Sequence, residues 1–112
     1  MNLTTEAVGP VTVVNLPMDT LDAANTHDFK AAMEPLLARG EPIVLDLSGV
    51  RFVYSSGCGA LLWCLRRLHT GEGAMKLGGV DPRVAELFGI IRLDRQIDTF
   101  ATAAEAVAAF DR

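Results

Sequence analysis

The fold is decided by residues 42–68, which read PIVLDLSGVRFVYSSGCGALLWCLRRL. The first part is an almost unbroken apolar run, as expected of a strand that is covered on both faces: Ile43, Val44, Leu45 and Leu47. A leucine-rich pattern follows and predicts a helix from about Ser56 to His69, which Gly71 and Gly73 end. A buried strand that runs directly into a helix is the repeating unit of α/β folds.

A helix is predicted ahead of this stretch, at residues 21–40. Its apolar side chains recur at helical spacing: Phe29, Met33, Leu36 and Leu37. Asp22 is the expected N-cap and Gly40 the expected stop. Pro35 conflicts with this helix because it removes a backbone donor.

Short strands and helices alternate through the rest of the chain. Further strands are expected at residues 11–16, 74–80 and 97–100, and further helices at residues 82–88 and 102–110. The strand at 11–16 should pair with an earlier one across a Gly-Pro turn. Asp81 is the expected cap of one helix, and Thr102 with Glu105 has capping-box spacing for the last.

This order of elements predicts an α/β fold in a single domain that spans residues 1–112. Alternating strands and helices imply parallel neighbouring strands joined by right-handed crossovers. We expect one small mixed sheet of about four or five strands, with about four helices packed on it. A chain of 112 residues can bury a core without help from a disulfide or a metal.

Composition and charge disfavour several classes of function. The formal net charge of −4 argues against nucleic-acid binding. No apolar run reaches the roughly 18–20 residues of a membrane span, and no secretory signal is recognisable, so a cytoplasmic protein is expected. Cys58, Cys64, His27 and His69 do not have the spacing of metal ligands. We therefore expect neither a metal nor a cofactor.

The junction at residues 52–59, FVYSSGCG, allows three interpretations from its chemistry alone. A nucleophilic Ser55 or Ser56 would need a base, but His69 lies roughly 20 Å away along the helix and His27 has no supporting motif. The glycines do not complete a dinucleotide fingerprint or a phosphate-binding loop. The plainest interpretation is a helix cap, in which a serine accepts a first-turn N–H and contributes about 1 kcal/mol.

Residues 44–62, VLDLSGVRFVYSSGCGALL, closely resemble the central signature of STAS domains, whose best-known members are bacterial anti-sigma factor antagonists. LDAAN at residues 21–25 resembles the start of that family's first helix. GAMKLGGVDPRVAELF at residues 73–88 resembles its third strand-to-helix passage. The resemblance covers nearly the whole chain and implies a regulatory binding domain without enzymatic activity.

The resemblance also implies a phosphorylation switch. In that family a partner serine protein kinase, which is also the anti-sigma factor, phosphorylates the serine that follows an acidic residue. The matching residue is Ser55, with Ser56 as the second choice. The unphosphorylated form would bind the kinase and free the sigma factor, and the phosphorylated form would not.

Tyr54 stands where the family commonly has the acidic residue. Family members that lack parts of the motif act as scaffolds or as parts of transporters. The alternative function is therefore a STAS scaffold that is never phosphorylated, or an accessory subunit of a stress-signalling complex or a transporter.

The second helix offers a further candidate for partner binding. Trp63 should lie opposite the expected core face, in the company of Gly59, Ala60, Arg66 and Arg67. It is either an interaction hot spot or the target of a covering neighbour helix. The candidate partner-binding residues are Asp22, Tyr54, Ser55, Ser56, Gly57, Cys58, Trp63, Arg66 and Arg67. We expect no nucleic acid and no membrane insertion, and a homodimer stays open.

Overall fold

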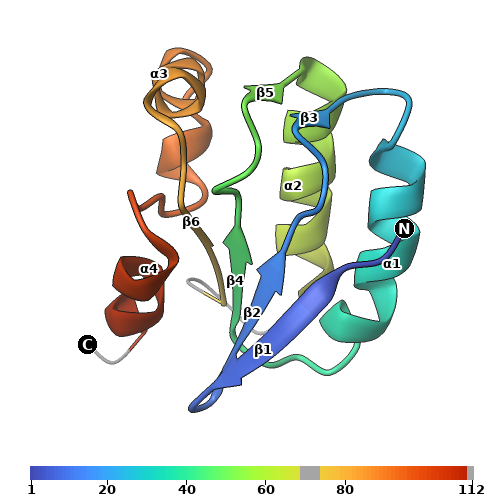
Figure 1. Cartoon of the computed structure of the whole chain (residues 1–112), viewed down its shortest axis with the longest axis vertical. Coiled ribbons are helices and arrows are strands. Elements are labelled where there is room, and N and C mark those ends of the chain that lie inside the picture. Colours follow the sequence, from blue (N-terminus) through green and yellow to red (C-terminus); the bar gives the residue numbers. More distant parts are fainter. Residues whose placement is uncertain (69–73, 111–112) are drawn as a thin grey trace.

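The computed structural model describes residues 1–68 and 74–110, and its centre is a four-stranded mixed sheet (Figure 1). The strands lie in the order β1-β2-β4-β6. β1 runs antiparallel to β2, and the other neighbouring pairs are parallel. The strands span Thr4–Val8 (β1), Val11–Asn15 (β2), Ile43–Asp46 (β4) and Met75–Gly78 (β6). The predicted α/β class with a mixed sheet is confirmed.

A two-stranded parallel sheet, which the sequence pattern does not predict, lies beyond the carboxyl ends of β2 and β4 (Figure 1). It pairs β3 (Thr20–Leu21) with β5 (Phe52–Val53). Strands of two residues are too short to show an alternating pattern. The Tyr54 N–H donates to the Leu21 carbonyl oxygen over 2.9 Å and extends the pairing. This small sheet fixes the segment before the second helix to the segment before the first.

Helices cover the two faces of the main sheet unequally (Figure 1). The helices span Thr26–Leu37 (α1), Ser55–Leu68 (α2), Pro82–Ile90 (α3), the 3-10 turn Leu93–Arg95 (η1) and Ala103–Ala109 (α4). α1, α2 and α3 bury the larger apolar core on one face, with Val14 and Leu45 from the strands. Side chains alternate along a strand, so Val13 and Val44 point to the other face, where they pack with Ala106 of α4.

The first helix begins later than the sequence pattern predicts. α1 begins at Thr26, and Asn25 rather than Asp22 occupies the N-cap position, so the predicted cap is wrong. The Asp22 carboxylate instead accepts a hydrogen bond from the Ala24 N–H over 2.9 Å. Such local hydrogen bonds hold a turn that competes with helix. Gly40 lies just beyond the helix with a φ of 69°, a left-handed conformation that suits its predicted role as the stop.

Both predicted caps in the C-terminal half are confirmed. The Asp81 carboxylate accepts a hydrogen bond from the Arg83 N–H over 2.9 Å at the start of α3. The Thr102 hydroxyl accepts one from the Glu105 N–H over 3.1 Å at the start of α4. These caps satisfy backbone donors that the first turn of a helix leaves without partners.

The strand predicted at residues 97–100 is wrong in extent. Thr99 makes an isolated parallel bridge with Leu77 of β6. The Leu77 N–H donates to the Asp98 carbonyl oxygen over 2.9 Å, and the Phe100 N–H donates to the Leu77 carbonyl oxygen over 2.8 Å. The segment therefore extends the sheet by one short pairing before the chain turns into α4.

The buried face of α2 is turned from the one that its leucine pattern predicts, because Leu62 and Leu65 are only half-buried. It comprises Gly57, Cys58, Ala60, Leu61, Cys64 and Leu68. Ala60 is fully buried, although the sequence places it on the outer side beside Trp63. The reason is that α1 packs alongside α2 and covers part of that outer side. Both cysteines of α2 are free and buried.

Candidate functional site

The two serines open α2 rather than cap it. The Cys58 N–H donates to the Tyr54 carbonyl oxygen over 3.0 Å, which places Tyr54 at the N-cap position of a helix that begins at Ser55. Within the described part of the chain, neither serine hydroxyl accepts a hydrogen bond from the first turn, so the predicted serine cap is wrong. The hydroxyl groups are therefore not engaged in holding the helix.

Gly57 allows the helix to approach the small sheet closely. A Cβ atom at this position would lie 2.7 Å from the Leu21 carbonyl oxygen and 3.0 Å from a Val53 methyl carbon. The same atom at Gly59 would meet nothing within 4 Å. The close packing of α2 on the small sheet therefore explains why residue 57 of the junction is a glycine.

Exposure divides the junction into an outer and an inner part. Tyr54 is 59% exposed, and Ser55 is exposed as well. Ser56 is half-buried. Gly57 and Cys58 are buried, which limits any part that they play in docking to shaping the surface. Phe52, Tyr54 and Ser55 are the side chains of the junction that a partner can reach most directly.

The N-terminus of α2 gives Ser55 a positive electrostatic environment. The hydrogen-bond ladder of the helix begins with the Cys58 N–H, so the N–H groups of the three preceding residues lie ahead of it. The aligned peptide dipoles place about half a positive charge at such a terminus. Every residue of this first turn is described, and none of them is acidic. A negative charge on Ser55 would therefore be tolerated by the helix.

Asp22 is brought to the junction by the pairing of β3 with β5. It directly follows Leu21, whose carbonyl oxygen accepts the Tyr54 N–H. Asp22 is half-buried, and its carboxylate is turned toward the Ala24 N–H. The structure thus brings three sequence-predicted site residues, Asp22, Tyr54 and Ser55, to one end of the molecule.

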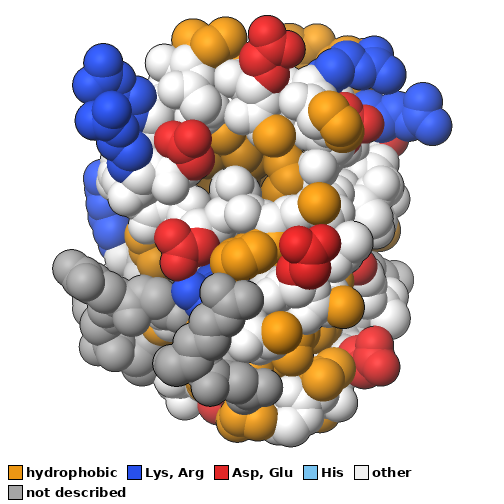
Figure 2. All heavy atoms as spheres, turned by 90° about the vertical axis from the view of Figure 1, so that its left-hand side faces the viewer, with side chains coloured by type: hydrophobic (Ala, Val, Ile, Leu, Met, Phe, Trp, Pro, Cys, Tyr) orange, Lys and Arg blue, Asp and Glu red, His pale blue; other side chains and the backbone are white. Residues whose placement is uncertain are grey.

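A small cavity of about 140 Å³ lies beside the junction, between β5 and α3. Its lining is aromatic, aliphatic and basic: Arg51, Phe52, Val53, Tyr54, Arg83, Val84 and Leu87. Phe52 is 51% exposed, so two aromatic side chains of this lining reach the surface. In Figure 2 basic side chains lie at both edges of the upper half of the molecule, with acidic and hydrophobic side chains between them. Sequence reasoning missed this cavity, because it depends on the packing of α3 against β5.

Trp63 lies apart from the junction, between α2 and α1. The Lys30 ammonium of α1 lies 5.6 Å from the centroid of its ring, and the Arg67 guanidinium lies 5.8 Å from it. Arg67 also pairs with Glu34 of α1. Trp63 is consequently half-buried, which agrees in part with the covering-helix alternative. Arg66 is exposed, and the structure does not bring this group together with Ser55.

Thiol and metal chemistry find little support in the described residues. Cys58 and Cys64 are both free and buried. Burial raises the pKa of the Cys58 thiol and raises that of Cys64 to about 12, so both stay protonated and weakly reactive. Among residues 1–68 and 74–110, no group of three or more His, Cys, Asp or Glu side chains could hold a metal ion. His69, one of the two bases considered, lies outside the described residues.

Comparisons with known proteins agree with this architecture. The sequence model of the STAS domain matches residues 2–106, so the chain belongs to the STAS domain family. No curated protein matches the sequence. Across the described helices, none is long and apolar enough to cross a membrane.

Solved structures share the fold at low sequence identity. An anti-sigma factor antagonist from Mycobacterium paratuberculosis is 21% identical, with a TM-score of 0.85 over 99% of this chain and 94% of that one. The Bacillus cell fate determinant SpoIIAA in its phosphorylated form is 23% identical, with a TM-score of 0.66 over 97% of this chain and 99% of that one. The murine anion transporter solute carrier 26 family member A9, in its inward-facing state, is 20% identical, with a TM-score of 0.73 over 92% of this chain and 18% of that one.

Proposed function

We propose that this protein is an anti-sigma factor antagonist that works by partner switching, with Ser55 as the phosphate acceptor. Its partner is an anti-sigma factor that is also a serine protein kinase, in the cytoplasm of a bacterium. The observation that favours this function is the exposed Ser55 in the first turn of α2, whose hydroxyl forms no hydrogen bond with the residues that the structure describes. The solved structure of a phosphorylated fold relative supports it.

The electrostatics of the junction allow such a switch to act on partner binding without destabilising the fold. A phosphoserine adds a charge of about −1.5 to −2 at neutral pH. At Ser55 that charge meets the positive end of α2, so phosphorylation leaves the domain folded. The same charge in a docked interface must be desolvated beside groups of the partner, which weakens the complex. One local modification thereby changes partner binding without changing the fold.

Exposed aromatic side chains next to Ser55 supply the contact surface that the switch acts on. Tyr54 and Phe52 reach the surface beside the basic Arg51 and Arg83. Aromatic and arginine side chains are the residues that most often dominate the binding energy of protein interfaces. We include Asp22 in this surface because β3 holds it against the junction, whereas Trp63, Arg66 and Arg67 form a second, separate candidate contact.

A second candidate function is a STAS scaffold or accessory subunit that is never phosphorylated. Tyr54 favours it, because a tyrosine cannot supply the carboxylate that the family commonly has before the serine. The fold relative that is an anion transporter shows that the same fold occurs in a much larger protein. The domain would then bind its partner through the same aromatic surface without being modified.

Intact-mass measurement separates these two functions. The protein is incubated with ATP and each serine protein kinase encoded in the same genome, as wild type, Ser55→Ala and Ser56→Ala. The switch predicts one added phosphate on the wild type and on Ser56→Ala, and none on Ser55→Ala. Stable complexes without any phosphate would instead support the scaffold. Phosphate that persists on Ser55→Ala and disappears from Ser56→Ala would move the acceptor to the second-choice serine.

A further inference from the structure

α4 leaves part of the second face of the main sheet uncovered, at β1. Neighbouring strands lie about 4.8 Å apart, so four strands place their outer axes about 14 Å apart, whereas one helix is about 10 Å wide. α4 contacts β6, β4 and β2. All five residues of β1 are exposed. The part of the face over β1 therefore forms an open shelf beside α4.

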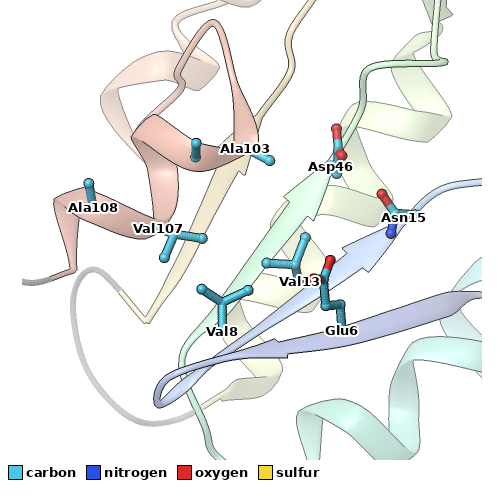
Figure 3. Close-up of a pocket in the computed structure, with 9 residues that line it drawn as sticks. Glu6, Val8, Val13, Asn15, Asp46, Ala103, Val107 and Ala108 are labelled. Carbon is cyan, nitrogen blue, oxygen red and sulfur yellow. The ribbon is translucent and has the colours of Figure 1, made fainter.

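A groove of about 420 Å³ runs along this shelf. Its lining comes from β1, from β2, from the end of β4 and from α4: Glu6, Val8, Val13, Asn15, Asp46, Ala103, Ala104, Val107 and Ala108. Figure 3 shows Val8, Val13 and Val107 facing the space between the strands and the helix, with Asp46 and Asn15 at one end. Val8 is 39% exposed, so an apolar wall of the groove lies open to solvent.

The charges of the groove are acidic. Glu6 lies on one wall, and Asp46 lies at the end where β4 stops. The Asp46 carboxylate accepts a hydrogen bond from the Ser48 N–H over 3.0 Å. In the described part of the chain, neither carboxylate forms an ion pair. An apolar floor between two free carboxylates fits a ligand that is apolar along one stripe and basic beside it.

We propose that this groove docks one amphipathic helix of a partner protein, with an apolar stripe flanked by lysine or arginine, laid over β1 and β2 beside α4. A helix laid along β1 would lie over the strand that α4 does not contact and would extend the layer that α4 begins. Small side chains on α4, at Ala104 and Ala108, let a second helix approach closely. The net charge of −4 on this chain favours a basic partner over a second copy of itself. This inference does not depend on phosphorylation at Ser55.

The test uses a pair of adjacent substitutions on β1. Val8 points into the groove, whereas its neighbour Ala7 points to the opposite face of the strand. Val8→Lys and Ala7→Lys change the net charge by the same amount at exposed positions, so both variants should fold. The probes are two designed helical peptides of about 14 residues, each about 21 Å long as a helix, with the same leucine stripe flanked by either lysine or glutamate.

Binding is followed by fluorescence anisotropy and by backbone amide NMR shifts of the whole chain. We expect the lysine-flanked peptide to bind and to shift the amides of Val8, Val13 and Val107. Val8→Lys should weaken it about tenfold or more, Ala7→Lys less than about twofold, and the glutamate-flanked peptide should bind about tenfold more weakly than the lysine-flanked one. Equal effects of the two variants, or no shifts at millimolar peptide, would overturn the proposal. So would shifts confined to the free edge of β1, or a dimer of the chain that Val8→Lys dissociates.

Discussion

Replacing Gly57 by alanine should destabilise the fold, whereas the same change at Gly59 should not. Both residues lie in α2, where alanine is favoured over glycine by about 1 kcal/mol. At Gly57 the new Cβ would lie 2.7 Å from the Leu21 carbonyl oxygen, a backbone atom that also accepts the Tyr54 N–H and cannot retreat freely. At Gly59 it would meet nothing within 4 Å.

Overpacking of a close contact costs about 1–3 kcal/mol, and this cost applies at Gly57 alone. Gly57→Ala should therefore be less stable than the wild type by up to about 2 kcal/mol, and Gly59→Ala more stable by up to about 1 kcal/mol. Urea unfolding followed by far-UV circular dichroism measures both free energies under one set of conditions. A Gly57→Ala variant as stable as Gly59→Ala would refute the close-approach argument.

Three further predictions concern a helix cap, a thiol and an ion pair. Thr102→Ala should lower the free energy of unfolding by about 1 kcal/mol, and thermal unfolding should show Thr102→Ser close to the wild type, because serine keeps the hydroxyl that accepts the Glu105 N–H. Burial raises the pKa of the Cys64 thiol from 9.0 to about 12, so just above pH 9 this thiol loses its proton in the unfolded chain but keeps it in the folded one. The unfolded state then binds fewer protons, and the wild type should lose stability relative to Cys64→Ala as the pH rises above about 9, in urea titrations at stepped pH. Asp98→Ala should cost about 1–2 kcal/mol in the same assay, because it leaves the buried Lys76 ammonium without the carboxylate that lies 2.8 Å away; a loss no greater than that of the surface change Glu86→Ala would count against it.

The sequence is most informative where one local interaction decides the structure. Asp81 and Thr102 cap their helices as predicted, since each hydrogen bond spans only two or three residues. The apolar run Ile43, Val44 and Leu45 lies in a buried strand between two parallel neighbours, as predicted, because a strand covered on both faces favours apolar side chains.

Prediction fails where segments far apart in the sequence decide the outcome. β3 and β5 form because two short segments pair with each other, and neither segment has a hydrophobic pattern that predicts a strand. Ala60 is buried by α1, which no periodicity within α2 can show. Asp22 has the composition of a helix cap, yet its turn with Ala24 is the local alternative that prevails. The cavity beside Tyr54 likewise depends on where α3 packs.

The contact between Gly57 and Leu21 shows that the glycine of the junction has a structural role of its own, independent of any role of Ser55. Position 57 must remain without a side chain for the helix to rest on the small sheet, whatever happens at position 55. A relative without a serine at the position of Ser55 would still need the same glycine for this packing. The glycine is therefore a marker of the fold, and a test of the proposed switch has to address Ser55 and its exposed neighbours instead.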